Sequence, residues 1–150
     1  MLVRLVYASR SRQPVTESLI ADILDKSRRQ NQELGLTGVL CVCPGDTFIQ
    51  VLEGSREDVN AIYAKIVRDD RHQDVTLLHY AEVDERRFSG WRMGRADLAK
   101  VNPGVVLRFS EKPRLDPLRI PGRVAVALLE ELMSSASILG GSGASGACGA

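Results

Sequence analysis

The stretch "LTGVLCVCPGDTFIQVLEGSRED", residues 36–58, contains the clearest secondary-structure signals of the chain. Two apolar runs, 36–42 and 47–53, are joined by "CPGD", whose proline and glycine are typical of a tight connection between antiparallel strands. Ser55 then precedes a segment with helical spacing of apolar residues, and serine is a favoured N-cap. The stretch therefore predicts a β-hairpin followed by a helix.

Gln50 is the unusual residue of this hairpin. Side chains alternate between the two faces of a strand, so Gln50 shares a face with Phe48 and Leu52, while Ile49 and Val51 share the other. A buried amide without hydrogen-bonding partners costs about 1–3 kcal/mol. We therefore expect specific partners for the Gln50 carboxamide.

The flanking sequence supplies the other elements. Residues 2–9 are rich in valine and leucine and indicate a strand, residues 75–83 indicate another, and "WRMGR" at 91–95 indicates a short fifth one. Thr16 can cap a first helix, and Ser55 opens the second. The apolar positions that share helical spacing are Leu19, Ile20, Ile23 and Leu24 in the first helix and Val59, Ile62, Ile66 and Val67 in the second.

This order, β-α-β-β-α-β with an extra strand, predicts an α+β fold of the ferredoxin-like type, in which both helices cover one face of the sheet. The first and third strands are then central neighbours, so Tyr7 and Gln50 can lie side by side. Tyr7 shares its face with Val3 and Leu5 and should point toward the helices. Arg4 lies on the opposite face and suggests that this face is less deeply covered.

The chain changes character after about residue 95. We expect a main domain over 1–95, a connection containing prolines and a helix over 96–138, and a flexible Gly/Ser/Ala tail over 139–150. The predicted C-terminal helix carries an apolar stripe formed by Val124, Leu128 and Leu132. This stripe should be buried against the open face of the sheet or against a partner subunit.

Composition limits the classes of function. The 150 residues are 44% hydrophobic and 26% charged, with 20 basic and 19 acidic residues, so the net charge of +1 favours neither nucleic acid nor a membrane surface as a partner. No secretory signal or long apolar run is evident, and we expect a cytoplasmic protein. Cys41, Cys43 and Cys148 are expected to be reduced thiols, with no metal site.

The two helices and the sheet together predict a ligand slot. One wall is the stripe of Ile20, Leu24, Ser27 and Asn31 on the first helix, and the other is the stripe of Ile62, Lys65, Ile66 and Asp69 on the second. With Tyr7 and Gln50 as the floor, the slot suits a flat, apolar, hydrogen-bonding molecule with a polar tail.

Each polar residue of this slot also has an ordinary structural explanation. Asn31 could cap the C-terminus of the first helix, and Ser27 could bond to its own backbone. Lys65 could be a solvated charge, Asp69 could form a surface pair with Arg71, and His72 could be a plain loop or core histidine. Only the convergence of these residues favours a site.

Four stretches resemble the BLUF family of flavin-binding blue-light sensors, over residues 1 to about 95. They are "LVYASR", "SRRQNQELGLTGVL", "FIQVLEGSREDVNAIYAKIVRDDRH" and "RRFSGWRMG", which occur in the order and at the spacing of the family. The resemblance implies a ferredoxin-like fold that holds FAD, or in some members FMN, with the flavin ring between the two helices. It also implies that Gln50 bridges Tyr7 and the flavin.

The resemblance implies roles for individual residues. Tyr7 is similar to the photoactive tyrosine of the family, Gln50 to its switch glutamine, and Asn31 to the asparagine that bonds the edge of the flavin ring. Trp91 and Met93 resemble the pair on the fifth strand that relays the signal. The positions that match the lining of the ring pocket or the approach to the phosphates are Ser27, Lys65, Asp69 and His72.

On this interpretation the chain is a photoreceptor and not an enzyme. Blue light drives an electron from Tyr7 to the flavin, a proton follows through Gln50, and recombination leaves a rearranged amide. We expect the output to reach a downstream signalling protein in trans and expect a homo-oligomer.

Two other classes of function remain open from the sequence. One is a flavin-binding or small-molecule regulatory domain without a photocycle. The other is an acylphosphatase-like hydrolase that would use Arg4, Arg10 or Arg12 to bind phosphate.

Overall fold

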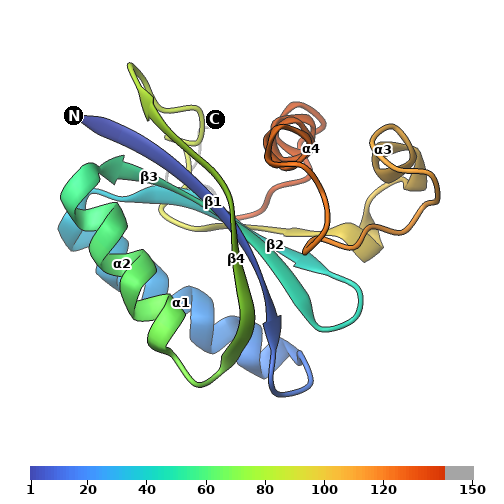
Figure 1. Cartoon of the computed structure of the whole chain (residues 1–150), viewed down its shortest axis with the longest axis horizontal. Coiled ribbons are helices and arrows are strands. Elements are labelled where there is room, and N and C mark those ends of the chain that lie inside the picture. The colour runs from blue at the N-terminus through green and yellow to red at the C-terminus, as the bar shows by residue number, and fades with distance from the viewer. Residues whose placement is uncertain (141–150) are drawn as a thin grey trace.

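The computed structural model describes residues 1–140 and has an α+β architecture (Figure 1). A single five-stranded sheet separates α1 and α2 on one face from α4 on the other. The elements in chain order are β1 (Leu2–Ser11), α1 (Glu17–Leu34), β2 (Thr37–Cys43), β3 (Thr47–Ser55), α2 (Arg56–Arg68), β4 (His72–Val83), β5 (Gly94–Asp97), the 3-10 turn η1 (Leu98–Lys100), α3 (Pro103–Leu107) and α4 (Gly122–Ser134).

The strand order is β4-β1-β3-β2-β5, which confirms the predicted ferredoxin-like core with a fifth strand. β1 lies between β4 and β3 and is antiparallel to both, whereas β5 extends the sheet by parallel pairing with β2. The register of β1 and β3 places Tyr7 directly opposite Gln50. The prediction that these two residues lie side by side is therefore confirmed.

The ends of α1 and α2 follow the capping residues. The Thr16 hydroxyl accepts a hydrogen bond from the Leu19 amide, and the Ser55 hydroxyl accepts one from the Asp58 amide. α1 ends at Gly35, whose φ of 69° is the left-handed conformation that glycine adopts readily. Asn31 is thus not the C-cap, and that alternative for it is wrong.

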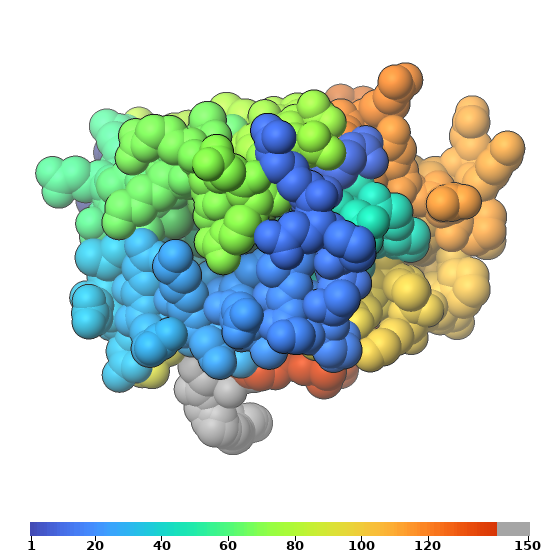
Figure 2. Space-filling view, turned by 90° about the horizontal axis from the view of Figure 1, so that it is seen from below, coloured from blue at the N-terminus to red at the C-terminus, as the bar shows by residue number. Residues whose placement is uncertain are grey.

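The face of the sheet under α1 and α2 carries one half of the core. Val3, Leu5 and Tyr7 of β1 pack there with apolar residues of both helices, as the alternation of side chains predicts. Val67 is an exception, because it is 53% exposed and does not join this core. In Figure 2, α1 (blue) lies beside residues of α2 and β4 (green), and the segment around α3 (yellow and orange) lies at the other end of the molecule.

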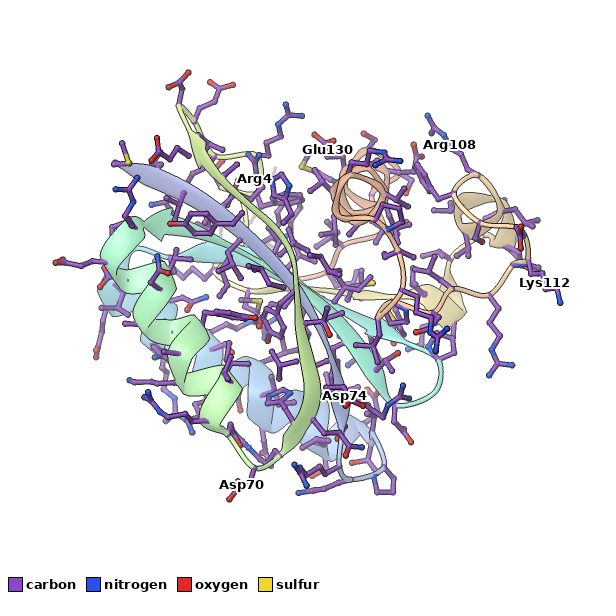
Figure 3. The ribbon with its side chains drawn as sticks, viewed as in Figure 1. Arg4, Asp70, Asp74, Arg108, Lys112 and Glu130 are labelled. Carbon is purple, nitrogen blue, oxygen red and sulfur yellow. The ribbon has the colours of Figure 1, made fainter. Side chains whose placement is uncertain are left out.

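α4 covers the opposite face of the sheet. Leu128 and Leu132 are fully buried there, which confirms the sheet face as the place for this helix, and Val124 is half-buried. Arg4 lies on the same side (Figure 3) and is 7% exposed, so the expectation that it marks a thinly covered face is wrong. The reason is its 2.8 Å ion pair with Glu53, which is itself fully buried.

The remaining predictions concern cysteines and membrane segments. Cys41 and Cys43 are buried free thiols on the α4 side of the sheet. Cys148 and the rest of 141–150 lie outside the described residues. Within residues 1–140, no helix has the length and apolar character needed to cross a bilayer.

Candidate functional site

One cavity of about 470 Å³ lies between α1 and α2, above the strands β1, β2 and β3. It brings together eight of the ten site residues predicted from the sequence, and the two that do not line it are Leu24 and Trp91. Leu24 packs in the core beside the cavity. The residues brought together are Tyr7, Ser27, Asn31, Gln50, Lys65, Asp69, His72 and Met93.

The floor of the cavity is a short hydrogen-bonded chain of side chains. The hydroxyl of Tyr7 donates to Oε1 of Gln50, and Nε2 of Gln50 donates to Sδ of Met93 at 3.3 Å. Tyr7 is 2% exposed and Met93 is fully buried. The buried Gln50 carboxamide thus has a hydrogen-bonding partner at each end, as its burial requires.

The phenol of Tyr7 is held in its protonated form. Burial raises the pKa of Tyr7 well above its ordinary value, and the nearby Tyr63 and Asp69 raise it further. The Tyr63 ring on α2 lies 5.6 Å from the Tyr7 ring, centroid to centroid, at an interplanar angle of 52°. The Tyr7 hydroxyl is therefore a donor toward Gln50 across the physiological pH range.

The α1 wall holds the chain segment that leads to β5. Asn31 is 3% exposed, and its side-chain amide donates to the carbonyl of Arg92. One turn earlier, Nε of Arg28 donates to the carbonyl of Met93 at 3.1 Å. Both residues thus tie the wall of the cavity to the segment that carries Met93.

Trp91 and Met93 do not lie on a strand, because β5 begins at Gly94. The two side chains point to opposite sides of the sheet. Met93 packs in the core under α1 and α2, whereas Trp91 is half-buried against the cluster under α4. Two residues spaced i, i+2 share a face only in regular extended backbone. Here the carbonyls of Arg92 and Met93 bond to side chains of α1 instead of a strand neighbour.

The mouth of the cavity is charged. Nη2 of Arg71 lies 2.6 Å from Oδ2 of Asp69, and this bond lowers the pKa of Asp69 to about 2. Nδ1 of His72 lies 3.1 Å from Oγ of the buried Ser9, and burial lowers the pKa of His72. His72 is therefore neutral at pH 7 and hydrogen-bonded inside the site.

Several lining residues were not predicted from the sequence as site residues. Arg71 enters the sequence analysis only as the surface partner of Asp69, yet it lines the cavity, as do Lys26 and Arg29, beside the predicted Lys65. The signal that could have found them is the recurrence of basic residues beside both polar stripes. Apolar side chains cover the inner walls, and they are Ile23, Leu40, Phe48, Leu52, Ile62 and Ile66.

These residues fit a flavin nucleotide. The volume lies in the range of small-molecule sites, the walls are apolar, and polar groups converge on the floor. Four cations against the two carboxylates Glu33 and Asp69 give the lining an excess of positive charge, which suits an anionic phosphate tail. The phosphate site of a hydrolase is not assembled from the first loop. Arg4 is paired with Glu53, Nε of Arg10 lies 3.5 Å from Asp74, and Nε of Arg12 bonds to a backbone carbonyl.

Curated sequence relatives match more than half of the chain. The photoactivated adenylate cyclase subunit beta of Euglena longa is 34% identical over 87 residues, which cover 58% of this chain and 10% of that protein. The subunit beta of Euglena gracilis is also 34% identical, over 63% of this chain and 11% of that protein. The chain thus spans about a tenth of the length of these curated relatives.

Solved structures extend the likeness to most of the chain. The photo-activated state of BlsA superposes with a TM-score of 0.77 at 31% identity, over 89% of this chain and 95% of that chain. The dark state of BlrB, a BLUF protein, superposes with a TM-score of 0.74 at 28% identity, over 90% of this chain and 96% of that chain. Residues 2–94 match the family described as sensors of blue-light using FAD. This match, over more than half of the chain, shows that the chain belongs to the BLUF family.

Proposed function

We propose that this chain is a blue-light photoreceptor whose switch is the hydrogen-bonded chain from Tyr7 through Gln50 to Met93. The observation that carries the proposal is the pair of bonds at the two ends of the Gln50 amide. They link an oxidisable phenol on the cavity floor to the segment that leads into β5. A change in the hydrogen bonds of Tyr7 and Gln50 therefore reaches Met93 directly, and Met93 precedes the edge strand β5.

Tyr7 acts as the electron donor in this proposal. When bound, the flavin supplies the absorption of blue light and, in its excited state, an electron acceptor. A buried phenol with a raised pKa does not ionise first, so loss of an electron and loss of the proton are coupled. The bond to Oε1 of Gln50 gives the phenolic proton an acceptor in the dark arrangement.

Gln50 acts as the movable element. A carboxamide has an oxygen acceptor at one end and an NH₂ donor at the other. If the amide turns by half a rotation, the NH₂ group can donate to the phenol oxygen, so the contact with Tyr7 survives. The carbonyl oxygen then faces Sδ of Met93, and because both atoms are acceptors, the bond to Met93 is lost. The two arrangements thus differ chiefly at Met93.

The remaining predicted site residues hold the cofactor in this proposal. Asn31 and Ser27 supply hydrogen-bonding groups on the α1 wall, and Leu24 supports that wall from the core. Lys65 lines the mouth with a mobile point charge suited to phosphate. Asp69 and His72 fix the shape of the mouth through their bonds to Arg71 and Ser9. FAD is the family cofactor, and the same mouth would accept the single phosphate of FMN.

For the rest of the chain we propose the division expected from the sequence: a sensor over 1–95, an extension over 96–138 and a tail over 139–150. We also propose that the chain acts on a downstream protein in trans, forms a homo-oligomer, catalyses no reaction itself and resides in the cytoplasm. The support for a sensor without catalysis of its own is the match of residues 2–94 to a family described as sensors of blue-light using FAD. The named activity of the Euglena relatives belongs to those proteins.

The absorption spectrum before and after blue light tests this function. A photoreceptor of this kind gives a yellow protein whose flavin band shifts to the red and recovers in darkness. A yellow protein without the shift would support an electron-transfer or regulatory flavoprotein. A colourless protein, after incubation with excess FAD, would contradict the proposal and revive the hydrolase alternative.

A further inference from the structure

The segment that follows α4 returns to the sheet and pairs with β5. The amide of Arg95 donates to the carbonyl of Leu139, and the amide of Leu139 donates to the carbonyl of Arg95, both at 2.8 Å. This antiparallel bridge lies on the edge of β5 that faces away from β2. Residues 138–140, which we call the C-terminal latch, thus cover the outer edge of the last strand.

Side-chain packing at the latch depends on Gly94. A Cβ atom at Gly94 would lie 2.6 Å from Cγ2 of Ile138 and 2.9 Å from Cδ1 of Trp91, so only glycine allows both to approach. Ile138 is 8% exposed, whereas Leu139 is 68% exposed. The latch is therefore held by two backbone hydrogen bonds and one buried aliphatic side chain.

The latch also approaches the switch through Arg28. Nε of Arg28 bonds to the Met93 carbonyl, and a Cβ atom at Gly140 would lie 2.5 Å from Nη2 of the same arginine and 3.8 Å from the Met93 oxygen. The side chain of Met93, meanwhile, accepts the hydrogen bond from Gln50. Met93, the last residue of the switch, is therefore connected to the latch through a single side chain, that of Arg28.

β5 itself is anchored independently of the latch. The guanidinium of Arg95 bonds to Glu17 at the start of α1, with Nη2 2.6 Å from Oε2. The strand also pairs with β2 over its four residues. If the latch leaves, β5 can thus keep its place and present an open edge.

We propose that residues 138–140 form a releasable edge strand that covers β5 in the dark and detaches when the bond between Gln50 and Met93 breaks. The proposal rests on the proposed photoreceptor function. Detachment exposes the amide and carbonyl of Arg95 and the hollow over Gly94. An open strand edge recruits an extended segment by backbone pairing. The partner class is therefore a peptide strand that places an aliphatic side chain where Ile138 lies.

Amide hydrogen exchange in the full-length, FAD-loaded chain tests this inference. In the wild type, the Arg95 amide should exchange at least about tenfold faster under continuous blue light than in darkness, since it loses the bond that it donates to the Leu139 carbonyl. The amides of β3 serve as an internal reference that should not change.

Two variants at position 139 isolate the backbone pairing. Leu139→Pro removes the amide that donates to Arg95, and Leu139→Ala removes the same exposed side chain but keeps the amide. Exchange at Arg95 should be fast in the dark in Leu139→Pro and should not rise further in light. Leu139→Ala should behave like the wild type.

The outcomes separate this inference from the function on which it rests. A wild type that shows the red shift but no light-dependent change at Arg95 overturns the latch and leaves the photoreceptor intact. A wild type without the red shift overturns the photoreceptor instead. If Leu139→Ala exposes Arg95 as fully as Leu139→Pro does, backbone pairing is not what holds the latch.

Discussion

Replacing Tyr7 with phenylalanine removes one hydroxyl from the floor of the cavity and leaves the ring in place. Tyr7 is 2% exposed, and its hydroxyl is the donor to Oε1 of Gln50. A buried carbonyl that loses its donor costs about 1–3 kcal/mol. Because 1 kcal/mol shifts the melting temperature by roughly 2–4 °C for a chain of this size, we expect Tyr7→Phe to melt about 2–12 °C lower and still fold.

The photochemical effect of Tyr7→Phe should be far larger than the effect on stability. Phenylalanine is much harder to oxidise than tyrosine, and it offers no proton to Gln50. The variant should bind FAD with less than about tenfold change in Kd, since the shape of the floor is kept, and should lose the red shift. The assay is the light-minus-dark absorption spectrum of protein at matched flavin content.

Tyr63→Phe is the matched control, because Tyr63 packs against the Tyr7 ring but has no bond to Gln50. It should retain the red shift. A Tyr7→Phe protein with wild-type amplitude and recovery would refute the reasoning, because the proposed donor would then be dispensable. Loss of the shift in Tyr63→Phe as well would mean that packing, not the hydroxyl, is required.

Three further predictions address Gln50, Asn31 and His72. Gln50→Leu should fold and bind FAD but show no red shift; a normal photocycle would exclude Gln50 as the switch. Asn31→Ala should be purified with less flavin than Asn60→Ala, which is an exposed control on α2. The Asn31 variant loses a buried amide whose hydrogen bonds are worth about 1–3 kcal/mol. Equal flavin occupancy in the two variants would mean that Asn31 only bonds to Arg92 and does not hold the flavin. Burial lowers the pKa of His72 below 6.5, so the unfolded state binds more protons and the free energy of unfolding should fall as pH drops below about 6.5. Urea titrations at several pH values should show a shallower dependence for His72→Gln, and an unchanged one would contradict this.

The neighbouring positions of Tyr7 and Gln50 could be predicted because two general rules determine them. Alternation of side chains assigns each residue to a face, and the order of elements makes β1 and β3 neighbours. Helix capping by Thr16 and Ser55 depends on short-range contacts and was equally predictable. The α2 wall of the cavity follows from helical spacing in the same way. On α1, Ile20 and Leu24 pack in the core instead of lining the cavity, and Ile23 lines it in their place.

Features that depend on long-range partners were not predictable from local patterns. Arg4 can be buried because the carboxylate of Glu53 neutralises its charge. The same carboxylate accepts hydrogen bonds from the backbone amides of Arg87 and Phe88, which are far away in the sequence. Trp91 is separated from Met93 because contacts with α1 prevent a regular strand there. The pairing of Leu139 with Arg95 likewise depends on where α4 packs.

The central claim is that the Gln50 amide changes its hydrogen bonds on illumination. The most direct measurement is the light-minus-dark infrared spectrum of protein carrying isotope-labelled glutamine side chains, recorded together with the red shift. The account predicts a glutamine carbonyl band that moves with the label and returns to its dark position as the absorption recovers, and that is missing in Gln50→Leu. A full red shift without any label-sensitive band would contradict the account.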